Sequence, residues 1–254
     1  MGIFDTHAHY LKRDFGEERD SVLDELPKKN VERVLAIGCG IDEFEEVAAV
    51  INKYDYIYGA FGVHPENADN LPEDWTERVE KILKEKKAVA LGEFGLDYHY
   101  NDQNKDVQRE VFTAQLEMAK RLDLPVIIHS RDACADTMEI LREYKPRGVM
   151  HCFSYSAETA AEVVKLGMYI GFTGVLTFKN AKKALAACEA VPIDRLLLET
   201  DCPYMAPEPH RGERCDSSMI EFTAAKMAEI KGVSTEEMIE IANKNGRKLF
   251  FNEG

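Results

Sequence analysis

The chain has 254 residues, of which 32 are Lys or Arg and 46 are Asp or Glu, so its formal net charge is −14. Hydrophobic residues make up 45% and charged residues 31% of the sequence, which is normal for a globular protein and excludes wholesale disorder. The negative charge excludes binding to nucleic acids or anionic membranes through total charge alone, but it allows a local cationic site.

Features that would indicate export or membrane insertion are missing from the sequence. No apolar run approaches the roughly 18 residues that a membrane helix needs, and no secretory signal follows the first residue. The six cysteines are scattered without a C-x-x-C pair, which is typical of free thiols in a reducing compartment. We therefore expect a cytoplasmic protein with no membrane association and no obligate protein partner.

Eight short apolar runs recur along the chain and predict strands. They are continuous rather than alternating, as in parallel sheets that are buried on both faces. Segments of helical periodicity lie between several of them, at 105–122, 157–166 and 179–190, and two more follow the last run, at 217–230 and 234–249. The eight runs are 3–4, 31–37, 57–63, 88–91, 125–128, 148–150, 168–171 and 195–198.

The spacing of these runs predicts the fold class. Each interval is long enough for one strand followed by one helix, and no linker or change in composition divides the chain. Eight such units without a boundary favour an α/β protein with a TIM-like (β/α)8 barrel that forms a single domain over residues 1–254. An open doubly wound sheet is the alternative.

Chemically reactive side chains follow several of the predicted strands. His7 and His9 lie two residues apart, so a strand would direct both imidazoles to the same face. The carboxyl ends of barrel strands converge at one mouth, where several buried imidazoles and carboxylates need partners. The pattern therefore predicts bound cations, with a purely structural hydrogen-bonded cluster as the alternative. The six candidate ligands are His7, His9, Glu93, His129, His151 and Asp201.

This nitrogen and oxygen ligand set suits Zn, Mn, Fe, Co or Ni, and also Mg with retained waters. Six protein ligands are more than one open catalytic site needs. We therefore predict two divalent ions per chain (Mg, Mn or Zn) with Glu93 as the bridging carboxylate, because two neighbouring cations activate a shared water. Asp201 is predicted both to bind metal and to accept a proton from that water.

Three further residues are candidates for binding the substrate. His64 closes the third predicted strand and is predicted to contact a phosphate or protonate the leaving group, with a structural histidine as the alternative. Arg131 is predicted to donate two hydrogen bonds to phosphate oxygens. The alternative is an ion pair with Asp132 or Asp136. Arg211 belongs to a basic cluster in a proline-bearing loop, which is either a flap over the substrate or an ordinary exposed loop.

Two aromatic residues follow the fourth predicted strand. Tyr98 and Tyr100 flank His99, and aromatic side chains can stack on nucleobases. Packing of these rings over the rim of the barrel is the alternative, and it is the one that we favour.

Together these motifs resemble the TatD family of metal-dependent deoxyribonucleases, which belongs to the amidohydrolase-type barrels. The resemblance covers essentially the whole chain and rests on segments 4–9, 62–65, 92–97, 125–131, 150–153 and 199–203. It implies a single-domain TIM-like barrel that hydrolyses phosphodiester bonds, often as a 3′ to 5′ exonuclease on single strands. It also implies one metal held by His7, His9, Glu93 and Asp201, and a second held by Glu93, His129 and His151.

Departures from the family pattern concern the substrate more than the metals. Glu66 stands where a second histidine is common, and segment 211–217 lacks the Asn, Glu and Pro that the family often has there. The predicted function is a deoxyribonuclease acting on single-stranded DNA or another phosphodiester. A hydrolase of small amides, lactones or phosphoesters is the alternative, because the same metals polarise a carbonyl. A non-catalytic protein with structural metals is a third hypothesis.

Overall fold

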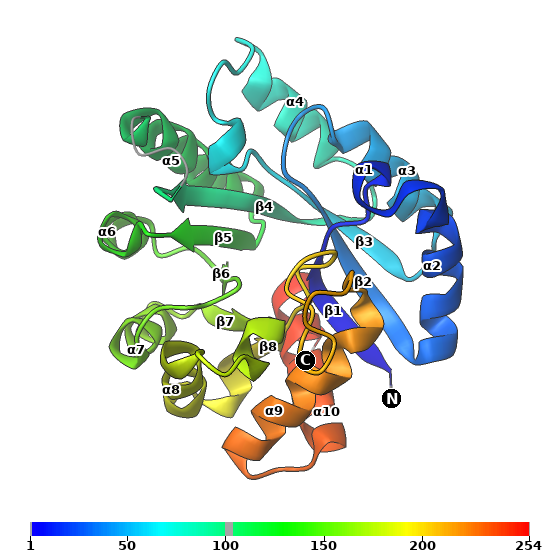
Figure 1. Ribbon diagram of the computed structural model, residues 1–254. Coiled ribbons are helices and arrows are strands. Elements are labelled where there is room, and N and C mark those ends of the chain that lie inside the picture. The colour runs from blue at the N-terminus through cyan, green and yellow to red at the C-terminus, as the bar shows by residue number, and fades with distance from the viewer. Residues whose placement is uncertain (1, 100–103, 254) are drawn as a thin grey trace.

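The computed structural model describes residues 2–99 and 104–253. Its centre is one sheet in which eight parallel strands lie in chain order, with helices around the outside (Figure 1). The predicted eight βα units are therefore present. The strands are β1 (Ile3–Ala8), β2 (Val31–Gly38), β3 (Ile57–Phe61), β4 (Ala88–Asp97), β5 (Val126–Arg131), β6 (Gly148–Met150), β7 (Tyr169–Phe172) and β8 (Leu196–Leu198).

The sheet closes between its first strand and the segment that follows its last strand. The Asp201 amide donates to the His7 carbonyl at 2.9 Å, and the His9 amide donates to the Cys202 carbonyl at 2.7 Å. A parallel bridge also pairs Ala8 with Cys202. An open doubly wound sheet is excluded by these contacts, and the predicted (β/α)8 barrel is confirmed.

Helices cover the outer face of the barrel, and their bounds agree closely with the periodic segments. The segment 105–122 forms a helix over its whole length, whereas 217–230 begins with a 3-10 turn, Ser217–Met219. Within the described part of the chain, no helix has the length and apolar character to cross a membrane. The helices are α1 (Lys12–Phe15), α2 (Arg19–Glu25), α3 (Phe44–Lys53), α4 (Trp75–Ile82), α5 (Lys105–Leu122), α6 (Cys134–Tyr144), α7 (Ala157–Lys165), α8 (Lys182–Ala190), α9 (Ile220–Lys231) and α10 (Thr235–Phe251).

Several strands are longer than the apolar runs that predicted them. β1 continues through His7, β4 continues past Glu93, and β5 continues past His129. The apolar runs stop at the first polar side chain, but strand pairing uses backbone groups and continues beyond it. Three of the predicted ligands therefore lie inside strands, where their side chains have fixed directions.

The barrel interior is filled by a compact apolar cluster that is separate from the larger cluster beneath the helices. Its members include Phe4, Leu35, Ile127 and Leu197 from four different strands, together with Leu249 from α10. The contribution from α10 shows that the last helix covers one end of the barrel. Dense packing of this kind holds the strands at fixed positions.

Two buried asparagines fasten α10 to the starts of β1 and β8. The Phe4 amide donates to Asn243 Oδ1 at 3.0 Å, and Asn243 Nδ2 donates to the Gly2 carbonyl. Asn245 Nδ2 donates to the Leu196 carbonyl at 2.9 Å. The helix at the end of the chain, red in Figure 1, therefore lies beside the first strand, drawn in blue, and joins the two strands that meet at the seam of the barrel.

Candidate metal centre

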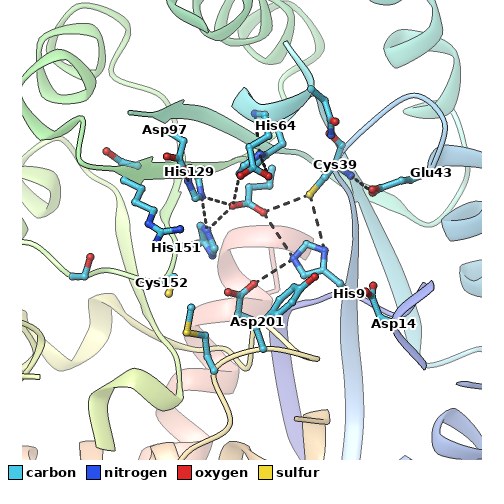
Figure 2. Close-up of a pocket in the computed structure, with 18 of the residues that line it drawn as sticks. His9, Asp14, Cys39, Glu43, His64, Asp97, His129, His151, Cys152 and Asp201 are labelled. Carbon is cyan, nitrogen blue, oxygen red and sulfur yellow. Dashed lines mark hydrogen bonds and ion pairs between the residues drawn. The ribbon is translucent and has the colours of Figure 1, made fainter. Parts of the chain in front are cut away.

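A cavity of about 690 Å³ opens among the residues that follow the strands, and most of the predicted ligands line its floor (Figure 2). His9, Glu93, His129, His151 and Asp201 are lining residues, whereas His7 lies beneath them with no exposed surface. The barrel thus brings together all six predicted ligands, which come from five different strands or strand ends.

Glu93 lies at the centre of the group because the register between β4 and β5 shifts at this residue. Gly92 pairs with Ile127 and Phe94 pairs with Ile128, so Glu93 has no partner on β5. Such an irregularity re-aims a side chain out of the regular alternation. The Glu93 carboxylate is only 4% exposed, which brings a buried charge into the histidine cluster.

The two oxygens of Glu93 face two different pairs of histidines. Oε1 lies 2.7 Å from His129 Nδ1 and 2.6 Å from His151 Nε2. Oε2 lies 3.2 Å from His7 Nε2 and 3.9 Å from His9 Nε2. One carboxylate therefore connects two sets of ligand atoms, which is the arrangement that a bridging ligand requires.

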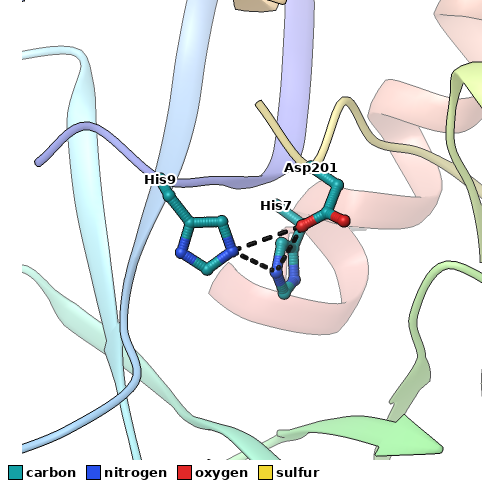
Figure 3. Close-up of side chains that lie close together, drawn as sticks. All are labelled: His7, His9 and Asp201. Atoms are coloured by element: carbon teal, nitrogen blue, oxygen red, sulfur yellow. Dashed lines mark hydrogen bonds and ion pairs between the residues drawn. The ribbon is translucent and has the colours of Figure 1, made fainter. Parts of the chain in front are cut away.

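The first set of ligand atoms is completed by Asp201 (Figure 3). His7 Nε2 and His9 Nε2 are 3.2 Å apart, and Asp201 Oδ1 lies 3.6 Å and 3.3 Å from them, respectively. The backbone bonds between β1 and the segment after β8 hold Asp201 against the two histidines. Two imidazole nitrogens and two carboxylate oxygens thus converge on one small volume, as the ligands of a divalent ion do.

Asp97 is a site residue that the sequence analysis missed. Its Oδ2 lies 3.0 Å from His129 Nε2, and the residue is 3% exposed. The opposite ring nitrogen of His129 faces Glu93, so Asp97 fixes the ring with Nδ1 directed at the ligand cluster. Carboxylates behind metal-binding histidines commonly have this orienting role. The four-residue spacing from Glu93 along β4 was the available signal, because even spacings in a strand share a face.

Two more buried groups lie beside the cluster and were also missed. Cys39 Sγ donates to Glu93 Oε2 at 3.6 Å, and burial raises the pKa of this thiol well above its usual range. Glu199 accepts a hydrogen bond from the Cys152 amide at 2.9 Å, and burial raises the pKa of its carboxyl to about 8. The Glu199 carboxyl occupies the space beside Gly171, where any Cβ would lie about 2.1 Å from it.

The clustered imidazoles and carboxylates shift one another's pKa values in opposing directions. Burial and the nearby His151 lower the pKa of His7 to about 4. Burial alone would lower the pKa of His129, but Asp97 and Glu93 at its two nitrogens raise it to about 9. Burial would raise the pKa of Glu93, yet the surrounding histidines hold it well below its usual range. Protons and divalent ions would therefore compete for some of the same ligand atoms.

Metal uptake at pH 7 is expected to release protons. A His129 pKa near 9 means that this imidazole is protonated at pH 7, and the proton on Nδ1 must leave before a cation can bind there. The affinity for divalent ions should therefore rise as the pH increases from 7 towards 9. Calorimetric titrations in buffers of different ionisation enthalpy count the released protons, and a proton count of zero at pH 7 would contradict this assignment.

The predicted substrate-binding residues have different positions. His64 and Arg131 both line the cavity. Of the two carboxylates named as alternative partners of the arginine, Asp132 pairs with His99 at 2.8 Å and Asp136 Oδ2 accepts a hydrogen bond from Tyr98.

Arg211 has a different environment. It is not among the residues that line the cavity. Its guanidinium instead lies 4.4 Å from the centre of the Phe178 ring. Its role in substrate binding stays a prediction.

The aromatic residues after β4 are only partly covered by the structure. Tyr98 packs against the apolar core, donates to Asp136 at 2.7 Å and lies under the Lys105 ammonium. These contacts agree with packing over the rim of the barrel. Tyr100 lies outside the described residues.

The whole chain matches a known family. A family model described as "TatD related DNase" covers residues 4–251. The chain belongs to this family. A Bacillus subtilis member named as an uncharacterized metal-dependent hydrolase, YabD, is 40% identical over 98% of both chains. The 3′-5′ ssDNA/RNA exonuclease TatD of Cronobacter sakazakii is 30% identical over 98% of this chain and 97% of its own.

A solved TatD structure has the same fold. The TatD homologue YjjV of Escherichia coli K12 aligns over 99% of this chain and 98% of its own, with a TM-score of 0.92 and 29% identity. The predicted family, the barrel and the assignment as a metal-dependent hydrolase are thereby confirmed. The identity and number of the metal ions and the roles of individual residues stay predictions.

Replacing Asp97 with Asn is expected to weaken metal binding by about 10-fold to 100-fold, the range found for carboxylates that orient metal-binding histidines. The amide keeps the shape of the side chain but removes the charge that orients His129. The measurement is metal affinity by competition with a chelator of known strength. The matched control is Asp132→Asn, which disrupts the exposed pair with His99 and should leave metal affinity unchanged. Equal affinities for all three proteins would contradict the orienting role.

Proposed function

We propose that this TatD-family chain is a deoxyribonuclease that holds two divalent ions and removes nucleotides from the 3′ end of single-stranded DNA. The placement of Glu93, with one oxygen towards His7 and the other towards His129 and His151, is the observation that carries the proposal. The name of the Cronobacter relative supports a nucleic acid as substrate. We propose Mg, Mn or Zn as the ions, because the donors are nitrogen and oxygen only.

The residues present fit two cations. His7, His9, Asp201 and Glu93 Oε2 would hold one ion, and His129, His151 and Glu93 Oε1 would hold the other. The buried Glu93 charge and the closely spaced imidazole nitrogens are difficult to satisfy with protons alone. When bound, two divalent ions supply the positive charge that activates water and polarises a phosphodiester.

Asp201 is proposed to accept the proton of the attacking water. Its Oδ1 faces His7 and His9, and the side chain is 13% exposed towards the cavity. Burial alone would raise the pKa of Asp201, but the hydrogen bond to His9 and the charges of His7 and His151 hold it below its usual range. The carboxylate is therefore ionised at neutral pH, as a general base must be.

His64 and Arg131 are proposed to bind the scissile phosphate. The Glu66 amide donates to His64 Nδ1 at 3.2 Å, which leaves the proton of the neutral ring on Nε2. Burial and the neighbouring His129 lower the pKa of His64 to about 3. The neutral ring is thus better suited to donate a hydrogen bond to a phosphate oxygen than to protonate a leaving group. Arg131 adds a permanent charge at the same cavity.

The deciding experiment uses a single-stranded oligonucleotide labelled at its 5′ end, incubated with enzyme and one metal at a time. A 3′ to 5′ exonuclease produces a ladder that shortens from the 3′ end, and a chelator abolishes it. Blunt duplex DNA, single-stranded RNA, and a panel of small amides, lactones and phosphoesters form the other arms. Hydrolysis confined to the small substrates would overturn the nuclease proposal in favour of the alternative.

We also propose that residues 1–254 form one hydrolase domain that works in the cytoplasm. The single family match over 4–251 and the closed barrel support one domain. The free cysteines support a reducing compartment.

A further inference from the structure

Two adjacent apolar side chains stand exposed in the wall of the polar cavity. Among the described residues, large apolar side chains are rarely exposed, and the two most exposed are Tyr204 at 53% and Met205 at 39%. Both line the cavity that holds the predicted metal ligands. Single exposed apolar residues need no explanation, but a contiguous pair beside a charged centre indicates a surface that an apolar group can cover.

The segment that carries this pair is fixed rather than loose. The Tyr204 amide donates to the Asp201 carbonyl at 3.0 Å, and the Cys215 amide donates to the Pro203 carbonyl at 3.0 Å. Met205 has a left-handed backbone, with φ of 54°, that its surroundings must maintain. Its carbonyl oxygen fills the position that a Cβ on Gly174 would occupy. The two side chains are therefore presented in a defined position before any ligand arrives.

The pair lies next to the predicted metal ligands, in the same cavity. The Tyr204 ring lies edge-on to His9, with 6.5 Å between ring centroids, and Tyr204 follows Asp201 by three residues. His64 and Arg131, which line the same cavity, come from the segment after β3 and from β5 rather than from the segment after β8. A phosphate held at the ligand cluster would thus place a base, one sugar away, within reach of an apolar wall.

We propose that Tyr204 and Met205 form a stacking platform for the base of the nucleotide that is being removed. This proposal rests on the proposed nuclease function and names a subsite for it. Aromatic side chains stack on every base and tolerate any sequence, which raises affinity by about 10-fold to 100-fold per base. A methionine thioether beside the ring adds an adaptable apolar surface.

The negative charge of the chain favours an uncharged contact of this kind. A net charge of −14 gives no general attraction for a phosphate backbone, and Asp14, Glu43 and Glu66 also line the cavity. Arg13, another lining residue, is paired with Glu43 at 2.6 Å. An acidic surface does not repel an uncharged base. Stacking on the base is therefore a way to hold DNA at the metal centre.

The test compares three probes on the metal-loaded full chain by calorimetry: thymidine 5′-monophosphate, 2-deoxyribose 5-phosphate and inorganic phosphate. The mononucleotide is expected to bind at least about 10-fold more tightly than the two probes that lack a base.

Three variants test which side chains cause this preference. Tyr204→Ala should remove it, Met205→Ala should reduce it, and Tyr204→Phe should keep it. Val107→Ala, which truncates a side chain of α5 that is 38% exposed, is the matched control and should change nothing.

Two readouts separate stacking from damage to the neighbouring centre. Metal content per chain and the affinity for inorganic phosphate should be the same in Tyr204→Ala as in the wild type. Equal binding of all three probes by the wild type would overturn the platform, and so would a Tyr204→Ala chain that loses phosphate and mononucleotide affinity to the same extent.

Oligonucleotide cleavage distinguishes this inference from the nuclease proposal on which it rests. With thymidine at the 3′ end, Tyr204→Ala should raise KM by about 10-fold or more with a small effect on kcat. A wild-type chain that prefers the mononucleotide but never cleaves DNA would refute the nuclease and support a base-binding subsite. A chain that cleaves DNA with the same KM after Tyr204→Ala would refute the platform alone.

Discussion

Replacing Glu93 with Ala is expected to reduce the metal content from two ions per chain to one at most. The substitution removes a carboxylate whose two oxygens face both ligand sets, so neither set stays complete. Turnover should fall by about 1,000-fold or more, since the paired charges contribute several kcal/mol to stabilisation of the transition state. Metal analysis of the purified variant measures the number of ions per chain. Single-turnover assays measure the fall in turnover.

Glu66→Ala is the matched control for this variant. Glu66 also lines the cavity, but its side chain is 52% exposed and its carboxylate lies 4.0 Å from His64. We expect it to keep both ions. If the Glu93→Ala chain retained two tightly bound ions, the bridging role would be refuted, whatever its activity.

Replacing Asp201 with Asn is expected to lower turnover by about 100-fold to 10,000-fold, the range that general base catalysis contributes, while much of the metal stays bound. The amide keeps an oxygen for ligation but cannot accept a proton. In the wild type, a lowered Asp201 pKa means that activity is lost only as the pH falls into the acidic range, where the carboxylate becomes protonated. This loss of activity at acidic pH, the acidic limb of the pH–rate profile, should be absent from the profile of the variant.

Asp14→Asn provides the comparison, because Asp14 also lines the cavity and has no predicted ligand role. It should keep both the rate and the acidic limb. Near-normal turnover by metal-loaded Asp201→Asn would show that another group accepts the proton, and Asp201 would then be a ligand only.

The barrel could be predicted because its strands are buried on both faces and appear as continuous apolar runs. The bounds of α5 agree with the periodic segment, since its apolar stripe extends over the full helix. The ends of β1, β4 and β5 could not be predicted in the same way. Their last residues are polar but still pair through the backbone, and hydropathy carries no information about such pairing.

The six predicted ligands could be grouped from the sequence because each is an imidazole or carboxylate that follows an apolar run. Asp97 and Cys39 were missed, since their importance comes from contacts with His129 and Glu93 that only the closed barrel creates. Tyr204 was missed for another reason. A ring beside a proline in a loop has no periodic pattern, and only its exposure in the cavity sets it apart.

The attachment of α10 to the starts of β1 and β8 means that the barrel can close only after α10 has been synthesised. His7 and His9 leave the ribosome before Asp201 and before the asparagines of α10. A nascent chain thus carries His7 and His9 before Asp201 and α10 can enclose them. We therefore expect the proposed metal loading to follow closure of the barrel, when the cations available in the cell affect which metal is acquired.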